Sequence, residues 1–439
     1  MKSDQASRGG RPFWTVALRG LALGALALAG SCVSPAPEEG APGELTLERV
    51  VMFSRHGVRP PTRLPVLPPG YAREAWPAWD VDPGHLTARG YEGARLIGAW
   101  TRQNLAARGL FAESECPAEG AVFVRTNTIH RTRESGRAFL EGFAPSCGVP
   151  IAHSAGERDD PLFDAIDLGR APFDPAAARA AIEARAGGDL AMSVARVRPA
   201  FDRLSEILGC CAPALCQEAG LSEGCSLGDL PHVWEDTPAN RRVRFTGPFA
   251  QGGTAAQSLL LAYVEGKPMR EVGWGRASAQ DIALLSEIHA VEFDLLARTP
   301  YIARRAAAFI LDHVMETLRA PQAPALSLLV GHDTNIANLG GVLDLHWRVP
   351  GYAPDDQAVS GAIGFELLRD AQGRRYVRVF YQAPSADQLR ALTPLTPDNP
   401  PYLAYLEQPL CAMREDRSLC RLEDFLRTTD AVLVRETDG

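Results

Sequence analysis

Two short apolar segments that each run into a histidine constrain this chain more than any other feature. Residues 45–54 are apolar with several β-branched side chains, which predicts a strand, and His56 follows almost at once. Residues 326–330 are continuously apolar and predict a second strand, closely followed by His332. Because ligands bind to open α/β sheets at the carboxyl ends of strands, we expect the two histidines to meet at one site.

Strands and helices alternate at both ends of the chain, around a middle part that has mostly helical patterning. This order predicts an α/β fold with a doubly wound, mainly parallel sheet and a helical insertion. Apolar residues make up 46% of the 439 residues, which is enough for a sizeable core. Besides the two strands above, we predict helices at 86–110, 131–143 and 301–320, strands at 121–125, 361–368 and 376–382, and a mainly helical stretch at 174–295.

The predicted domains follow from this order. An α/β domain is expected from residues 45–155 together with 296–439. Residues 156–295 would form the helical insertion domain, a lid over the active site.

The first 31 residues are typical of a signal peptide. A basic stretch ends at Arg19, and the ten residues 20–29 are apolar. That is too short for a bilayer span, which needs roughly 20 residues, but it suits a secretory signal. The small residues before Cys32 resemble a bacterial lipobox, in which this cysteine is lipidated. The alternative is plain cleavage after Ala29, which leaves Cys32 free.

Residues 32–44 are rich in proline and are expected to be a tether. Together with the signal this predicts an exported protein on the periplasmic side of the bacterial envelope, anchored there by lipid, or otherwise a periplasmic or secreted protein. The only membrane contact that we expect is the lipid on Cys32.

The cysteine count fits an exported protein. There are nine cysteines, and removing Cys32 leaves eight, an even set suited to four disulfides. These eight are Cys116, Cys147, Cys210, Cys211, Cys216, Cys225, Cys411 and Cys420.

Spacing alone suggests some of the pairs. Cys116 and Cys147 bracket one segment, and Cys411 and Cys420 close a short loop. Cys216 and Cys225 have that same short spacing. The adjacent Cys210 and Cys211 would then bond to each other, or each of them would pair with one of Cys216 and Cys225. A zinc site in this cluster is the rival interpretation, but paired C-x-x-C motifs are missing.

The charge of the chain argues against a nucleic-acid partner. The net charge is −8, and residues 1–31 contribute +3, so the remainder carries −11. An acidic body of this kind binds nucleic acid poorly unless it has a concentrated basic site.

The residues around the first histidine predict an anion site. Arg55 and Arg59 flank His56, and placing two guanidinium groups so close together is costly unless an anion compensates them. Guanidinium forks match phosphate oxygens bidentately, so we expect a phosphate group. Gly57 allows a close approach of the backbone.

At this point the sequence resembles a known family. The run from Arg55 to Thr62, together with the distal His332-Asp333, is similar to the signature of the histidine acid phosphatases, most of all their bacterial periplasmic phytase type. The resemblance extends over nearly the whole mature chain. Further matching segments are 76–79, 86–90, 131–136, 273–275, 296–300 and 331–341.

The resemblance implies two catalytic residues. His56 would be the nucleophile and form a phosphohistidine, which splits one displacement into two easier ones. Asp333 would protonate the leaving alcohol and then assist the attack of water.

The resemblance also implies residues that bind the substrate. Arg131 heads the Arg-Thr-Arg run and is therefore preferred to Arg125 and Arg133, and a Cys116–Cys147 disulfide would hold its segment in place. The phosphate-binding set is Arg55, Arg59, Arg131 and His332. Thr62 and Thr334 match positions that line the substrate pocket.

The expected function is therefore hydrolysis of small phosphomonoesters, with phytate (myo-inositol hexakisphosphate) as the leading substrate and no metal or cofactor. A broad-range acid phosphatase and a glucose-1-phosphatase are the alternatives. A more remote one is a non-catalytic, lipid-anchored phosphate-ligand binding protein. His332-Asp333 also fits a metal-dependent HD phosphohydrolase, but that site needs further ligands on helices.

Overall fold

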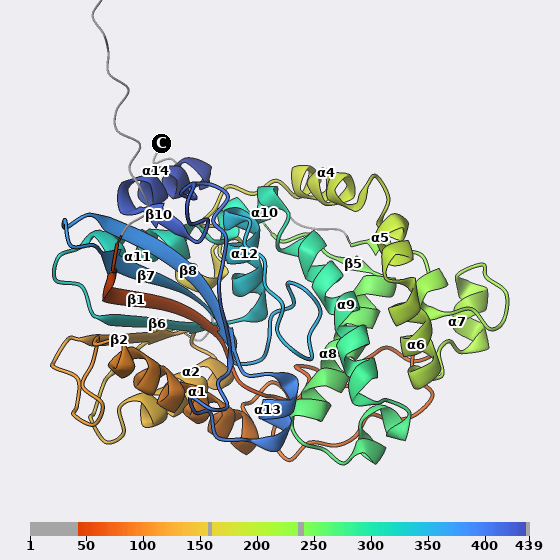
Figure 1. Ribbon diagram of the computed structural model, residues 1–439. Helices are drawn as coiled ribbons and strands as arrows, with labels where there is room; N and C mark the ends of the chain where they lie inside the picture. Colours follow the sequence, from red (N-terminus) through yellow and green to blue (C-terminus); the bar gives the residue numbers. More distant parts are fainter. Residues whose placement is uncertain (1–42, 157–159, 236–240, 436–439) are drawn as a thin grey trace, which may run out of the picture. The chain divides into compact units, whose positions relative to one another are not determined.

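The computed structural model of the chain describes residues 43–156, 160–235 and 241–435 (Figure 1). The predicted signal peptide and Cys32 lie outside these residues, as does nearly all of the predicted tether. Within the described ranges, no helix has the length and apolar character needed to cross a membrane.

A mixed sheet forms the centre of the fold. Its strands lie in the order β10-β8-β7-β1-β6-β2-β3, and β9 pairs with β8. The pairs β1–β6, β6–β2 and β2–β3 are parallel, and the strands on the other side of β1 are antiparallel. The bounds are β1 Thr46–Arg55, β2 Val122–Thr126, β3 Ile151–Ala152, β6 Leu326–Gly331, β7 Ala362–Arg369, β8 Arg375–Ala383, β9 Tyr402–Tyr405 and β10 Leu419–Arg421.

Alternate residues of β1 pack into two cores on opposite faces of the sheet, as a pleated strand requires. Val50 and Met52 join the core under α1 and α2, while Val51 and Phe53 join the core that α11 and α12 cover. Figure 1 shows the first two helices below the sheet. The predicted α/β architecture is confirmed. The covering helices are α1 Ala88–Ala107, α2 His130–Phe143, α11 Ala308–Arg319, α12 Asp333–Leu343 and α14 Leu422–Val432.

Helices also dominate the segment between β3 and α10, beside the sheet (Figure 1). The sequence did not predict the small hairpin that interrupts them, β4 Val233–Trp234 with β5 Phe245–Thr246. The division of domains at residues 156 and 295 stays a prediction. The helices of the segment are α3 Pro161–Asp164, α4 Pro175–Ala186, α5 Leu190–Arg196, α6 Arg198–Leu208, α7 Pro213–Glu218, α8 Pro248–Val264 and α9 Ala279–Leu296.

The predicted helix 301–320 is wrong as one element. The structure has two helices there, α10 Pro300–Ala306 and α11 Ala308–Arg319, with a break at Ala307. The two helices pack against different partners, since α10 contacts α12 and α4 while α11 contacts β1. Tertiary packing therefore overrides the continuous helical pattern.

Four disulfides join the eight cysteines. The pairs are Cys116–Cys147, Cys210–Cys211, Cys216–Cys225 and Cys411–Cys420. The structure thus pairs the adjacent cysteines with each other, and the cluster is left without a free thiol for zinc. Across the described ranges, no group of three or more His, Cys, Asp or Glu side chains is arranged to hold a metal ion.

Candidate active site

The parallel pairing of β1 with β6 brings the two sequence-predicted histidines together. Arg55, the last residue of β1, lies opposite Gly331, the last residue of β6. The His56 backbone N–H donates to the Gly331 carbonyl at 3.1 Å. The ring centroids of His56 and His332 are 5.7 Å apart. Two motifs far apart in the sequence therefore share one site at the carboxyl edge of the sheet.

The His56 ring is held in one tautomer. Its Nδ1 lies 2.8 Å from the Gly57 carbonyl oxygen, so Nδ1 carries the proton and Nε2 keeps its lone pair. The side chain is buried, with 1% exposed. Burial lowers the pKa of His56 well below its usual range, and nearby arginines lower it further, in the order Arg131, Arg59 and Arg55. The imidazole is therefore neutral, and nucleophilic at Nε2, even in acid.

Backbone packing fixes the loop that follows His56. A Cβ atom on Gly57 would lie 2.5 Å from the Gly90 carbonyl oxygen, and one on Gly90 would lie 2.3 Å from that of Val58. Neither position tolerates a side chain, which explains both glycines. The Gly57 N–H also donates to Ser135 Oγ on α2 at 2.9 Å. The loop is thus tied to α1 and α2 before it reaches Arg59.

Arg55 connects the sheet to the helical segment. Its side chain is buried and donates to the Gln357 carbonyl and, at 2.8 Å, to Gln257 Oε1 on α8. Its Nη2 also lies 2.9 Å from Asp333 Oδ2. These contacts hold the guanidinium group beside Asp333.

Arg59 and Arg131 make few contacts with protein acceptors. Arg59 Nη1 donates to the Pro60 carbonyl at 3.0 Å, and Arg131 Nη1 donates to the Gly84 carbonyl at 3.4 Å. In the part of the chain that the structure describes, the buried Nε of each has no partner. Burial lowers the pKa of Arg59 to about 9 and that of Arg131 to about 10, so both remain charged in acid. Buried cations with spare donors indicate an anion-binding site.

His332 is a neutral member of the same cluster. It caps the N-terminus of α12, where its backbone N–H donates to Asn335 Oδ1 at 3.1 Å. Burial, followed by the charge of Arg131, lowers the pKa of His332 to about 3. Its Nδ1 is buried and has no partner among the described residues. The ring can therefore hydrogen-bond to a ligand.

The Asp333 carboxyl group is ionised. Burial alone would raise its pKa, but the charge of Arg55, followed by that of Arg59, outweighs burial and holds the pKa of Asp333 well below its usual range. One carboxylate oxygen pairs with Arg55, and the other accepts the Thr334 N–H at 2.9 Å. A bound anion would offset the arginine charges and make protonation of Asp333 easier.

The two threonines lie in different places. Thr62 lines a cavity that Arg59 and Asp333 also line, and we call this cavity the substrate pocket. Thr334 lines a neighbouring cavity instead, together with Arg242 and Phe293.

Helices α8 and α9 supply pocket residues that the sequence analysis did not assign. Gln257 lies on α8, and His289 and Glu292 lie on α9. His289 Nδ1 is 2.7 Å from Asp356 Oδ1, which fixes its ring. None of these three positions lies in a motif that the sequence predicted.

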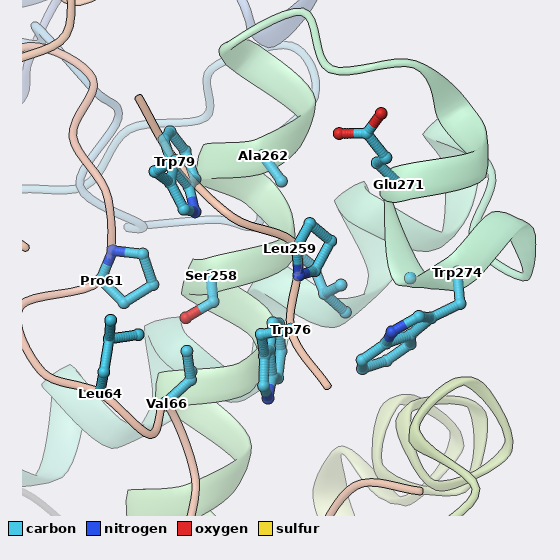
Figure 2. Close-up of a pocket in the computed structure, with 12 residues that line it drawn as sticks. Pro61, Leu64, Val66, Trp76, Trp79, Ser258, Leu259, Ala262, Glu271 and Trp274 are labelled. Carbon is cyan, nitrogen blue, oxygen red and sulfur yellow. The ribbon is translucent and has the colours of Figure 1, made fainter. Parts of the chain in front are cut away.

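A second hollow next to the substrate pocket is aromatic (Figure 2). Trp76, Trp79 and Trp274 line it, and the Trp76 and Trp274 rings are 5.2 Å apart. The two cavities share Pro61, Val66 and Ser258. The predicted motifs at 76–79 and 273–275 thus form one wall beside the pocket.

Comparison with known proteins identifies the family. Residues 46–203 and 290–382 match the histidine phosphatase superfamily (branch 2). The chain belongs to this family. It is 36% identical to phytase AppA of Escherichia coli (strain K12) over 408 residues, which cover 89% of this chain and 93% of that one. It is also 30% identical to glucose-1-phosphatase of Salmonella typhimurium over 415 residues, with coverage of 91% and 96%.

Solved structures agree with this family. The phytase of Citrobacter braakii superimposes with a TM-score of 0.81 at 31% identity, covering 89% of this phosphatase and 98% of that chain. The Hafnia alvei phytase in complex with myo-inositol hexakis sulphate gives a TM-score of 0.81 at 31% identity, with coverage of 90% and 98%.

The anion site predicts a contrast between two arginines of α2. Arg131→Ala should weaken binding of inorganic phosphate, since a lost charge-assisted hydrogen bond costs about 1.5–3 kcal/mol, or roughly 10- to 100-fold. Arg133→Ala removes an exposed charge two residues away and should leave binding unchanged. Isothermal titration calorimetry at pH 5 measures both. Equal affinity in the two variants would exclude Arg131 from the site.

Proposed function

We propose that this protein hydrolyses phosphomonoesters through a phosphohistidine on His56. Membership of its family makes it a phosphoric monoester hydrolase. The observation that carries the proposal is a neutral His56, with Nδ1 bound to the Gly57 carbonyl, inside a cluster of buried arginines. That arrangement provides a nucleophile and its anion site together.

In the first step, the Nε2 lone pair of His56 forms a bond to phosphorus as the bond between phosphorus and the ester oxygen breaks. Asp333 gives its proton to the leaving oxygen, which departs as an alcohol. In the second step, Asp333 accepts a proton from water as the water oxygen attacks phosphorus, and His56 leaves with its lone pair restored.

The cationic groups stabilise the transferring phosphoryl group. Arg59 and Arg131 have donors to spare for its oxygens, and Arg55 adds charge beside Asp333. Fixed donors aimed at developing charge lower the barrier without any metal ion.

Phytate is the leading substrate. The support is the similarity to a phytase of E. coli and to phytases of known structure, one of them in complex with an inositol hexasulphate. A glucose-1-phosphatase preference is the second candidate, since a relative of that name is 30% identical. A broad-range acid phosphatase is the third. Intact His56 and Asp333 argue against a purely binding role.

We further propose export and lipidation at Cys32. The support is the lipobox-like sequence before Cys32 and the four disulfides of the remaining cysteines, which form in oxidising compartments. The anchor would hold the enzyme on the periplasmic side of the envelope.

A turnover panel tests the function. Phytate, glucose 1-phosphate and p-nitrophenyl phosphate are assayed at pH 4.5 in EDTA, and phytate should give the highest kcat/KM. His56→Ala should lose on the order of 10³-fold or more on all three, because the nucleophile is gone. A His56→Ala enzyme that retains activity would refute the mechanism, whereas a different substrate ranking would overturn only the phytate assignment.

Asp333→Asn should separate substrates by leaving group. For inositol phosphates, whose alkoxide needs a proton, kcat should fall by roughly 10²- to 10⁴-fold. For p-nitrophenyl phosphate, which releases a stable phenolate, the loss should be much smaller. The wild-type rate on inositol phosphates should fall as pH rises and Asp333 loses its proton in the complex, and the variant should lack this decline. Steady-state kinetics between pH 3 and 7 measure both effects, and equal losses on the two substrates would show that Asp333 is not the acid.

A further inference from the structure

One carboxyl group of the substrate pocket has no role in the mechanism above. Glu292 lies on α9 and lines the pocket together with Arg59 and Asp333. A Cβ atom on Gly253 of α8 would lie 1.7 Å from Glu292 Oε2. The absence of a side chain at Gly253 is therefore what makes room for the carboxyl group between the two helices.

The Glu292 carboxyl group is not used to hold the fold together. Within the described ranges no hydrogen bond or ion pair engages it, and neither of its oxygens is fully enclosed. It also borders the neighbouring cavity, which Arg242, Arg244 and Thr334 line. Arg242 is paired with Asp167 at 3.1 Å. Glu292 is thus a partly buried acid that faces space open to a ligand.

We propose that Glu292 is a specificity-determining residue, whose carboxyl group discriminates between leaving groups with and without further phosphate groups. This inference rests on the proposed function. The cluster around His56 takes the phosphate that is transferred, so the rest of the substrate extends past Asp333 into the remaining pocket, where Glu292 lies. Additional phosphates would come close to this carboxyl group, whereas a neutral leaving group would not interact with its charge.

The protonation state of Glu292 would determine whether the pocket favours or disfavours leaving groups that carry further phosphate groups. Burial raises the pKa of Glu292 well above its usual range, and the negative charge of Asp333 raises it further. The group is therefore neutral in acid and becomes negative as pH rises through its raised pKa. The charged or titratable groups that line the two cavities around it are His289 on α9, Asp333 on α12, Arg59 and Arg63 after β1, and Arg242 and Arg244 near β5.

The consequence is a pocket that admits polyanions in acid and disfavours them above the raised pKa of Glu292. A neutral carboxyl group can donate a hydrogen bond to a phosphate oxygen, whereas an ionised one repels it. A unit charge a few ångströms from a phosphate in such a site changes affinity by about tenfold.

Binding of myo-inositol hexasulfate tests this without any turnover. Its sulfate groups keep the same charge between pH 4.5 and 9, so a change of Kd with pH reports on the protein alone. Calorimetry compares the wild type with Glu292→Gln and Glu292→Ala. Glu287→Gln is the matched control, because it removes a charge from the same helix outside the lining of the pocket.

At the highest pH of a series from pH 4.5 to 9, both Glu292 variants should bind the hexasulfate about tenfold more tightly than the wild type and Glu287→Gln. At pH 4.5 Glu292→Gln should match the wild type within about twofold, because both side chains are then neutral. Binding of inorganic sulfate, which occupies only the phosphoryl site, should differ less among the variants. Equal hexasulfate affinities throughout that series, or weaker binding by the Glu292 variants at its highest pH, would overturn the inference. Because the readout is affinity, it stands apart from the His56→Ala test of the proposed function.

Discussion

Buried positive charge around one neutral histidine is the constraint on which the site depends. The pairing of β1 with β6 places Arg55 and His56 beside His332 and Asp333, and α2 adds Arg131. Such a cluster costs free energy unless anions compensate it. Asp333 offsets part of the charge through its pair with Arg55. A phosphate group would offset the rest, so the site is organised for its ligand before the ligand arrives.

The same positive charges affect the protonation of neighbouring titratable groups in different ways. They keep His56 unprotonated in acid, where a free histidine would be charged, and this preserves its lone pair. They also hold the pKa of Asp333 well below its usual range, so that its carboxyl group is ionised. Glu292 shares the pocket but has its pKa shifted in the opposite direction, because burial dominates there. The pKa values of two carboxyl groups in one pocket are thus shifted in opposite directions, because the surroundings of the two groups differ.

Local patterns were sufficient to predict the centre of the site. A strand that runs into His56 with flanking arginines, and a second strand that runs into His332, specify both the sheet edge and the anion chemistry. Arg131 needed the family resemblance, because nothing local separates it from Arg133. Gln257 and Glu292 could not be predicted, since their place in the pocket depends on how α8 and α9 pack against each other.

The fold, too, could be predicted from the sequence only where local patterns determine it. Each strand at the centre of the sheet was visible as an apolar run, but the break at Ala307 was not, because the two helices there differ only in what they pack against. Sequence spacing also left the pairing of Cys210 and Cys211 open, and the structure joins them to each other. Long-range packing determines features such as the helix break and the cysteine pairing, and a single sequence contains little information about that packing.

Direct detection of the covalent intermediate tests the central claim. The enzyme is mixed with p-nitrophenyl phosphate at acid pH, quenched within milliseconds into alkaline denaturant that preserves phosphohistidine, and digested for peptide mass spectrometry. We expect the mass of one phosphoryl group on the peptide that contains His56, localised to its imidazole and absent after quenching in acid. A phosphoryl group on another residue, or none during active turnover, would contradict the account.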